Sequence, residues 1–112
     1  ADEDFMNKVM KIIEDNIGED DFNVETMADI LCMSHSSLLR KIRSVFNMSP
    51  VELIRTVKLK KAAELIQEGK HLIGDICYMV GIASPSYFSK LFFKQFGISP
   101  KDFEKQCRER KP

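Results

Sequence analysis

Two segments of the chain carry polar and basic side chains at helical spacing. Ser36, Arg40 and Arg43 lie at positions i, i+4 and i+7, so they share one face of a helix. In a second segment, Lys90 stands in the place that Arg40 occupies in the first. An arginine or lysine at such a place can donate hydrogen bonds to the major-groove edge of guanine. The residue types and their spacing therefore favour hydrogen bonding to base edges, and helices must position them.

We predict that the N-terminal part and one face of each of these helices read base edges. The candidates for base readout are His35, Ser36, Ser37, Arg40, Arg43, Ser86, Ser89, Lys90 and Lys94. Backbone amides at helix starts and four lysines are candidates for phosphate contacts: Lys41, Lys58, Lys60 and Lys61. A solvated surface charge is the alternative for each single basic residue, and the spacing argues against it most strongly for Arg40 and Lys90.

The sequence lacks the residue groupings that enzymes use. No nucleophile is paired with a base, His35 and His71 are isolated, and no glycine-rich phosphate loop exists. The acidic pair Asp20-Asp21 is expected in an exposed turn. We therefore predict a protein that is not an enzyme and that needs no cofactor and no metal.

Three widely spaced cysteines give neither a disulfide framework nor paired zinc ligands. We expect free thiols at Cys32, Cys77 and Cys107. Cys32 and Cys77 stand among apolar residues and are predicted to be small core residues.

The composition is that of a folded domain, because 44% of the 112 residues are hydrophobic and 30% are charged. No apolar stretch has the length of a membrane helix, and no signal peptide is visible. Since the chain opens without an initiator methionine, we expect a piece of a longer protein.

The net charge is zero, but the charges are unevenly distributed. Residues 1–30 hold ten acidic and two basic side chains, a balance of −8, and residues 31–112 hold seven acidic and fifteen basic, a balance of +8. An acidic N-terminal segment followed by a basic remainder of the chain is typical of a nucleic-acid-binding protein whose first segment faces away from the ligand. Charge alone would favour the alternative, an ordinary solvated surface with uneven charge.

Apolar periodicity and capping residues predict an all-α fold. Ser34, Ser49, Ser84 and Ser99 each precede an apolar-periodic segment and are interpreted as N-caps, not nucleophiles. Gly18, just after the first segment, is expected to end its helix. Seven helices are expected, over about 4–17, 24–31, 35–46, 50–68, 72–80 and 85–96, and from 100 into the basic tail.

The apolar sets of these helices are expected to face inward. Ile30 and Leu39 belong to the inward sets of their helices. The aromatic residues of the second segment are also interpreted as core, because they lack the interleaved pattern of a single-strand binder: Tyr87, Phe88, Phe92, Phe93 and Phe96.

The chain contains an internal repeat. Residues 27–53 read MADILCMSHSSLLRKIRSVFNMSPVEL, and residues 76–103 read ICYMVGIASPSYFSKLFFKQFGISPKDF. The first parts match at an offset of 49 and the ends at an offset of 50, so the second copy has one inserted residue, which the sequence does not locate. Each copy has a short helix, a tight turn and a capped helix, which is the spacing of a helix-turn-helix.

The repeat predicts two helix-turn-helix subdomains, over 1–48 and 70–112, joined by a linker helix over 49–69. The helix over about 50–68 would be roughly 28 Å long at about 1.5 Å per residue. Successive major grooves on one side of DNA lie roughly 34 Å apart. One monomer could therefore place two recognition helices in successive grooves.

The repeat resembles the DNA-binding domain of the AraC/XylS family of bacterial transcription regulators, over about residues 5–108. The most specific stretches are Gly81 to Phe92 and Phe96 to Pro100. Cys32 and Asn47 depart from the family pattern, where glycine is usual, and Cys77 stands where alanine is usual. The sequence of the first copy from Met33 to Ile42 is similar to domains at the C-terminus of hybrid two-component sensor regulators.

The resemblance implies a homeodomain-like fold, sequence-specific binding to double-stranded DNA, and transcription regulation, usually activation. It also implies RNA polymerase and other domains of a longer regulator chain as partners, a monomeric fragment, and a cytoplasmic location within a protein that can be membrane-anchored. The alternative is a helical protein–protein docking module of a signalling protein. A basic face repeated fifty residues apart argues against that alternative.

Overall fold

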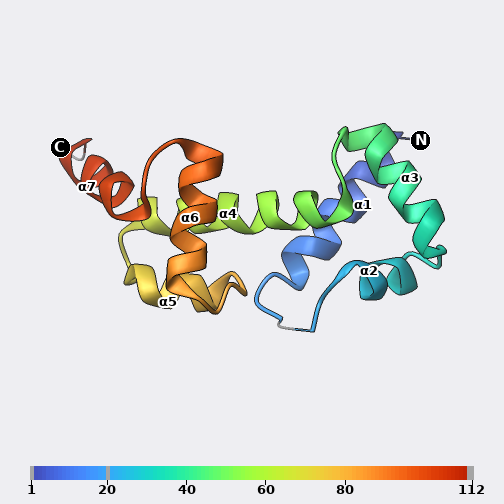
Figure 1. Cartoon of the computed structure of the whole chain (residues 1–112), viewed down its shortest axis with the longest axis horizontal. Helices are drawn as coiled ribbons and strands as arrows, with labels where there is room; N and C mark the ends of the chain where they lie inside the picture. The colour runs from blue at the N-terminus through green and yellow to red at the C-terminus, as the bar shows by residue number, and fades with distance from the viewer. Residues whose placement is uncertain (1, 20, 111–112) are drawn as a thin grey trace. The chain divides into compact units, whose positions relative to one another are not determined.

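The computed structural model describes residues 2–19 and 21–110, which form seven helices and confirm the predicted all-α fold (Figure 1). Of the residues described, none lies in a helix that is both long and apolar enough to cross a membrane. The helices are α1 (Asp2–Asp15), α2 (Val24–Ile30), α3 (His35–Phe46), α4 (Pro50–Glu68), α5 (Ile73–Met79), α6 (Pro85–Phe96) and α7 (Pro100–Arg110).

The predicted bounds of α3, α4 and α6 are confirmed, because side-chain caps and a proline mark their starts. The end of α1 was predicted wrongly. The helix ends at Asp15, before Gly18, and the Asn16 side chain donates to the Ile12 carbonyl at 2.8 Å. Asp20, half of the predicted acidic turn, lies outside the described residues.

The chain divides into two compact units, Ala1–Val57 and Lys58–Pro112. The division falls inside α4, so each unit completes its core with part of that helix. The subdomain boundaries predicted at residues 48 and 70 are not tested by this division and stay a prediction.

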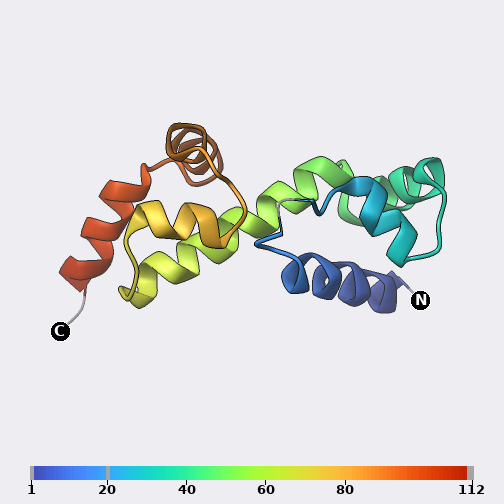
Figure 2. The same cartoon turned by 90° about the horizontal axis from the view of Figure 1, so that it is seen from below.

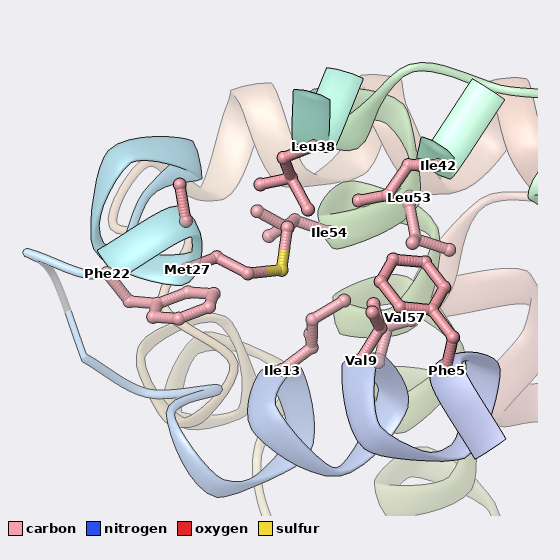
Figure 3. Close-up of a cluster of buried hydrophobic side chains, with 11 residues drawn as sticks. Phe5, Val9, Ile13, Phe22, Met27, Leu38, Ile42, Leu53, Ile54 and Val57 are labelled. Carbon is pink, nitrogen blue, oxygen red and sulfur yellow. The ribbon is translucent and has the colours of Figure 1, made fainter. Parts of the chain in front are cut away.

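In the first unit, α1 packs its apolar face against the helices of the repeat (Figure 3). Side chains from α1, α2, α3 and α4 converge on one cluster, and the thioether of Met27 lies among them. The buried residues are Phe5, Val9, Ile13, Phe22, Met27, Ala28, Leu38, Ile42, Leu53, Ile54 and Val57.

In the second unit, α5, α6 and α7 surround the C-terminal part of α4 (Figure 2). Phe92 is the centre of an aromatic cluster, with ring centroids 5.7 Å from Phe88, 4.6 Å from Phe96 and 5.7 Å from Phe103. The buried residues are Leu59, Ala62, Leu65, Ile66, Ile76, Cys77, Val80, Ile82, Phe88 and Phe92.

Several residues predicted to be core lie at the surface. Ile30 is 53% exposed and Leu39 is 38% exposed, because each lies on the flank of its helix rather than on the stripe that faces the core. Cys32 is also exposed, since it occupies the turn and not a helix face. Cys77 is buried as predicted.

Candidate nucleic-acid interface

A left-handed residue ends the first helix of each repeat copy. Cys32 has φ 55° and Gly81 has φ 74°. After each, a backbone amide reaches back to the first helix: Met33 N donates to the Ala28 carbonyl and Ile82 N to the Cys77 carbonyl, both at 2.9 Å. This hydrogen-bond pattern is the Schellman motif, and it fixes the direction in which the chain enters the second helix.

A serine N-cap starts the second helix in each copy. The Ser34 Oγ accepts from Ser37 N at 3.2 Å, and the Ser84 Oγ accepts from Tyr87 N at 3.3 Å. The left-handed residues match at an offset of 49, whereas the caps match at an offset of 50. The structure therefore locates the inserted residue, which the sequence alone did not, at Ala83 in the second turn.

On α3, a polar face points away from the buried Leu38 and Ile42. At about 100° per residue, Ser36, Arg40 and Arg43 lie within about 60° of one another around the helix. All three are exposed. The structure therefore brings these three predicted residues together on the solvent side of the first unit.

On α6, the corresponding face carries Ser86 and Lys90. Lys94 follows at i+4 from Lys90, about 40° further round the helix. All three are exposed, while Phe88 and Phe92 on the other side of the helix are buried. Neither α3 nor α6 contains an acidic residue. Both polar faces are therefore suited to an anionic partner.

The remaining base-readout candidates lie beside these faces. His35 is the first residue of α3 and is exposed, and Ser89 is exposed on the flank of α6. Ser37 is half-buried, and its hydroxyl oxygen accepts from the Ser34 hydroxyl at 2.9 Å. The hydroxyl of Ser37 is therefore part of the cap.

The four lysines predicted to contact phosphates differ in their surroundings. Lys60 is exposed, and Lys61 is exposed with its Nζ 4.0 Å from Glu64. The Lys41 Nζ lies 4.6 Å from the ring centroid of Phe5. Lys58 is half-buried and donates to the Gly81 carbonyl at 3.4 Å, which ties α4 to the turn of the second unit.

Sequence reasoning missed several exposed residues of α3 and α6. The offset of 50 that pairs Arg40 with Lys90 also pairs Ser44 with Lys94, and Arg43 with Phe93. Ser44 is exposed. Phe93 is 59% exposed, Tyr87 is 49% exposed and Phe96 is 39% exposed, so the prediction that these three are core is wrong. The positions of Phe93 and Tyr87 around the helix, outside the stripe of Phe88 and Phe92, decide their exposure.

Among the residues described, no three His, Cys, Asp or Glu side chains are grouped so that they could hold a metal ion.

Comparisons with known proteins agree with this geometry. A family model described as "Helix-turn-helix domain" matches residues 27–106. Histidine kinase P4 of Formosa agariphila is 38% identical over 108 residues, which are 96% of this chain and 8% of that protein. The HTH-type transcriptional activator CfaD of Escherichia coli is 30% identical over 99 residues, which are 88% of this chain and 37% of that protein. The chain thus spans less than half the length of either relative.

A solved structure of the DNA-binding domain of AdpA, a global transcriptional factor, in complex with a target DNA is also similar. It superposes with a TM-score of 0.86 at 25% sequence identity, and the match covers 95% of each chain. The repeated turn, the paired capped helices and the match over residues 27–106 together show that the chain belongs to the helix-turn-helix family of AraC-type regulatory domains.

Proposed function

We propose that the chain binds specific sequences in double-stranded DNA by placing α3 and α6 in successive major grooves, as the output part of a transcription regulator. The observation that carries this proposal is the repeated polar and basic face. It stands at matching positions of two capped helices and points away from each core. The similar AdpA domain was solved in complex with a target DNA, which supports DNA binding by this chain.

The side chains of the two faces suit major-groove contacts. Arg40 and Arg43 can each form a bidentate hydrogen bond with guanine, and Lys90 can donate to the same acceptors. Within residues 2–19 and 21–110, none of these three groups has a carboxylate within 4.0 Å. The charge of Arg43 helps to lower the pKa of Glu52, but none of the three groups forms a close ion pair, so base readout is assigned to them first.

The remaining candidates supply smaller contributions to the same interface. Backbone amides at the N-termini of α3 and α6 can donate to phosphates. We assign phosphate contacts to Lys41, Lys60 and Lys61, which are exposed. Lys58 is assigned last, because it already donates to the Gly81 carbonyl.

The chain is proposed to act within a larger regulator. Similarity to a part of histidine kinase P4 supports a kinase in the same polypeptide, and similarity to the activator CfaD supports transcriptional activation, for which we propose RNA polymerase as the partner. We propose that this part works in the cytoplasm, where the DNA is, that it has no catalytic step of its own, and that it is monomeric when isolated.

The test is a titration of the chain onto random duplex DNA and onto promoter DNA from its own genomic neighbourhood, at two salt concentrations. We expect affinity to fall steeply as salt rises, because phosphate contacts release counterions. Arg40→Ala and Lys90→Ala should each weaken promoter binding by about 1–3 kcal/mol and reduce promoter preference more than random-duplex affinity.

Two exposed basic residues outside the proposed interface serve as matched controls. Arg108 and Lys105 lie on α7, and replacing either by alanine should leave promoter preference unchanged. If the chain shows no salt-sensitive binding even at low ionic strength, the DNA proposal is wrong for this chain. The protein–protein docking module would then be the better description.

A further inference from the structure

One aromatic side chain stands on the proposed DNA-reading face of the second unit. Phe93 is 59% exposed, although Phe88 and Phe92 of the same helix are fully buried. At about 100° per residue, Phe93 lies about 20° from Ser86 and about 60° from Lys90 around α6. Its ring therefore belongs to the same surface as the polar residues of that face, and it contributes little to the core.

The repeat shows that this position differs in kind between the two units. Phe93 occupies the place that Arg43 occupies in α3. At these two matched positions the first unit presents the guanidinium groups of Arg40 and Arg43, and the second presents the ammonium group of Lys90 and the phenyl ring of Phe93, with Lys94 adding a second ammonium group in the place of Ser44. Guanidinium groups match the acceptors of guanine, whereas an apolar ring matches the one apolar group in the major groove, the C5-methyl of thymine.

We infer that Phe93 is a specificity-determining residue that contacts a thymine methyl group in the half-site of the second unit. The inference rests on the proposed DNA binding and adds the base type to it. The first unit then prefers guanine, and the second requires a thymine close to the base that Lys90 contacts. The target is accordingly asymmetric, which fixes the direction in which the chain lies on it.

The surroundings of the ring favour DNA over an apolar protein surface as its partner. Lys90 and Lys94 flank Phe93 at i−3 and i+1, and α6 contains no acidic residue. Burying the ring against a protein would require desolvating or pairing both ammonium groups. A DNA groove accepts both, because phosphates line it on either side.

The test starts from duplexes selected from a random library with the intact chain. The half-site of the second unit is identified as the positions whose preference is lost in Lys90→Ala. Each thymine in that half-site is then replaced by deoxyuridine, which removes only the methyl group. We expect one replacement to weaken binding about fourfold, since burial of one methyl group contributes about 0.8 kcal/mol and 1.4 kcal/mol is tenfold.

Phe93→Ala should bind the unmodified duplex more weakly and should no longer distinguish thymine from deoxyuridine at that position. Phe93→Leu should retain part of the distinction, because leucine is still apolar. Tyr78→Ala is the matched control: Tyr78 is a 66% exposed aromatic on α5, outside the two helices that are proposed to enter the grooves. This control should distinguish the two duplexes as the unmodified chain does.

Each outcome decides the inference. If no single deoxyuridine weakens binding of the unmodified chain, or if Phe93→Ala keeps the full distinction, the methyl contact is wrong while DNA binding stands. The first of these results needs no variant, so it does not depend on whether Phe93→Ala folds. If the chain shows no salt-sensitive DNA binding at all, the proposed function fails and the inference fails with it.

Discussion

At the scale of single residues, position 32 carries a backbone cost that its counterpart in the second turn avoids. Cys32 has φ 55°, a region in which a side chain with a Cβ costs about 1–2 kcal/mol, whereas Gly81 adopts φ 74° without that cost. Glycine also loses more chain entropy on folding, by about 0.5–1 kcal/mol. We therefore expect Cys32→Gly to stabilise the first unit by about 0.5–1 kcal/mol, measured by urea unfolding.

The reciprocal change is the control for this prediction. Gly81→Ala introduces a Cβ at the same position of the second turn and should lower the free energy of unfolding by about 1 kcal/mol. If Cys32→Gly destabilises the protein instead, the thiol must make contacts in the turn that outweigh the backbone cost.

The three thiols should differ in reactivity because they differ in exposure. Cys77 is buried, and burial raises the pKa of its thiol, whereas Cys32 is exposed and Cys107 is half-buried. In native buffer, a thiol reagent should modify Cys32 and Cys107 and should reach Cys77 only in denaturant. Mass spectrometry of the labelled peptides measures this, and early labelling of Cys77 would contradict the buried position.

The raised pKa of the Cys77 thiol makes the stability of the protein depend on pH. Because the folded thiol of Cys77 holds its proton more tightly than the unfolded one, the free energy of unfolding should decrease as the pH rises above about 8.5. Cys77→Ala should remove that part of the pH dependence. An unchanged slope in this variant would show that other groups cause it.

At the scale of elements, α4 begins with a capping box that depends on pH. The Ser49 Oγ accepts from Glu52 N at 3.2 Å, and Ser49 N donates to the Glu52 carboxylate at 3.4 Å. Hydrogen bonds from Ser49 hold the pKa of Glu52 below its ordinary value. A lowered folded pKa means that the stabilisation is present above about pH 4.3 and is lost as the pH falls below it.

Urea unfolding at pH 7 and pH 3 tests this cap. Ser49→Ala should lower the free energy of unfolding at pH 7 by about 1 kcal/mol, because the N-cap is lost. Glu52→Gln keeps an oxygen acceptor but no charge, so it should be less stable than the unmodified chain at pH 7, and this difference should become smaller at pH 3. A difference that is as large at pH 3 as at pH 7 would mean that the glutamine changes more than the charge.

The helices could be predicted from the sequence because their ends are encoded locally. Ser34 and Ser84 cap helices with their own hydroxyl groups, and Asn47 and Gly97 end those helices in the left-handed conformation. The exposure of Ile30, Leu39 and Phe93 could not be predicted in this way. Apolar periodicity finds the stripe that faces a core, but it does not show how wide the packed stripe is. Ile30 and Leu39 lie on the flanks of their helices, and Phe93 lies beyond the stripe on the polar face of α6.

The candidate site was predictable for a related reason. Arg40 and Lys90 were found because the repeat gives the same helix face twice, and a face opposite a core must be exposed. Phe93 was missed because its residue type, read alone, indicates a core. The repeat offset of 50 pairs Phe93 with the surface residue Arg43, so it would have predicted that Phe93 is exposed.

At the scale of the whole molecule, two small cores share one helix. Each unit has fewer than sixty residues, a size at which a domain buries only about 60% of its surface and is marginally stable. At about 0.05–0.15 kcal/mol per residue, each unit would have roughly 3–8 kcal/mol of its own. The free-energy cost of one large cavity in a core is therefore comparable with the free energy of unfolding of the entire unit.

For this reason, Phe92→Ala should unfold the second unit while the first unit stays folded. Phe92 is fully buried and its ring contacts three other aromatic rings, so the truncation should cost about 3–5 kcal/mol. We expect hydrogen exchange to show loss of protection in α5, α6 and α7, while amides of α1 and α3 remain protected by the first core. Ile42→Ala, in the first core, should produce the opposite pattern. Since Val57 and Leu59 of one continuous helix belong to different cores, simultaneous loss of protection in both variants would show that α4 makes the two units a single cooperative structure.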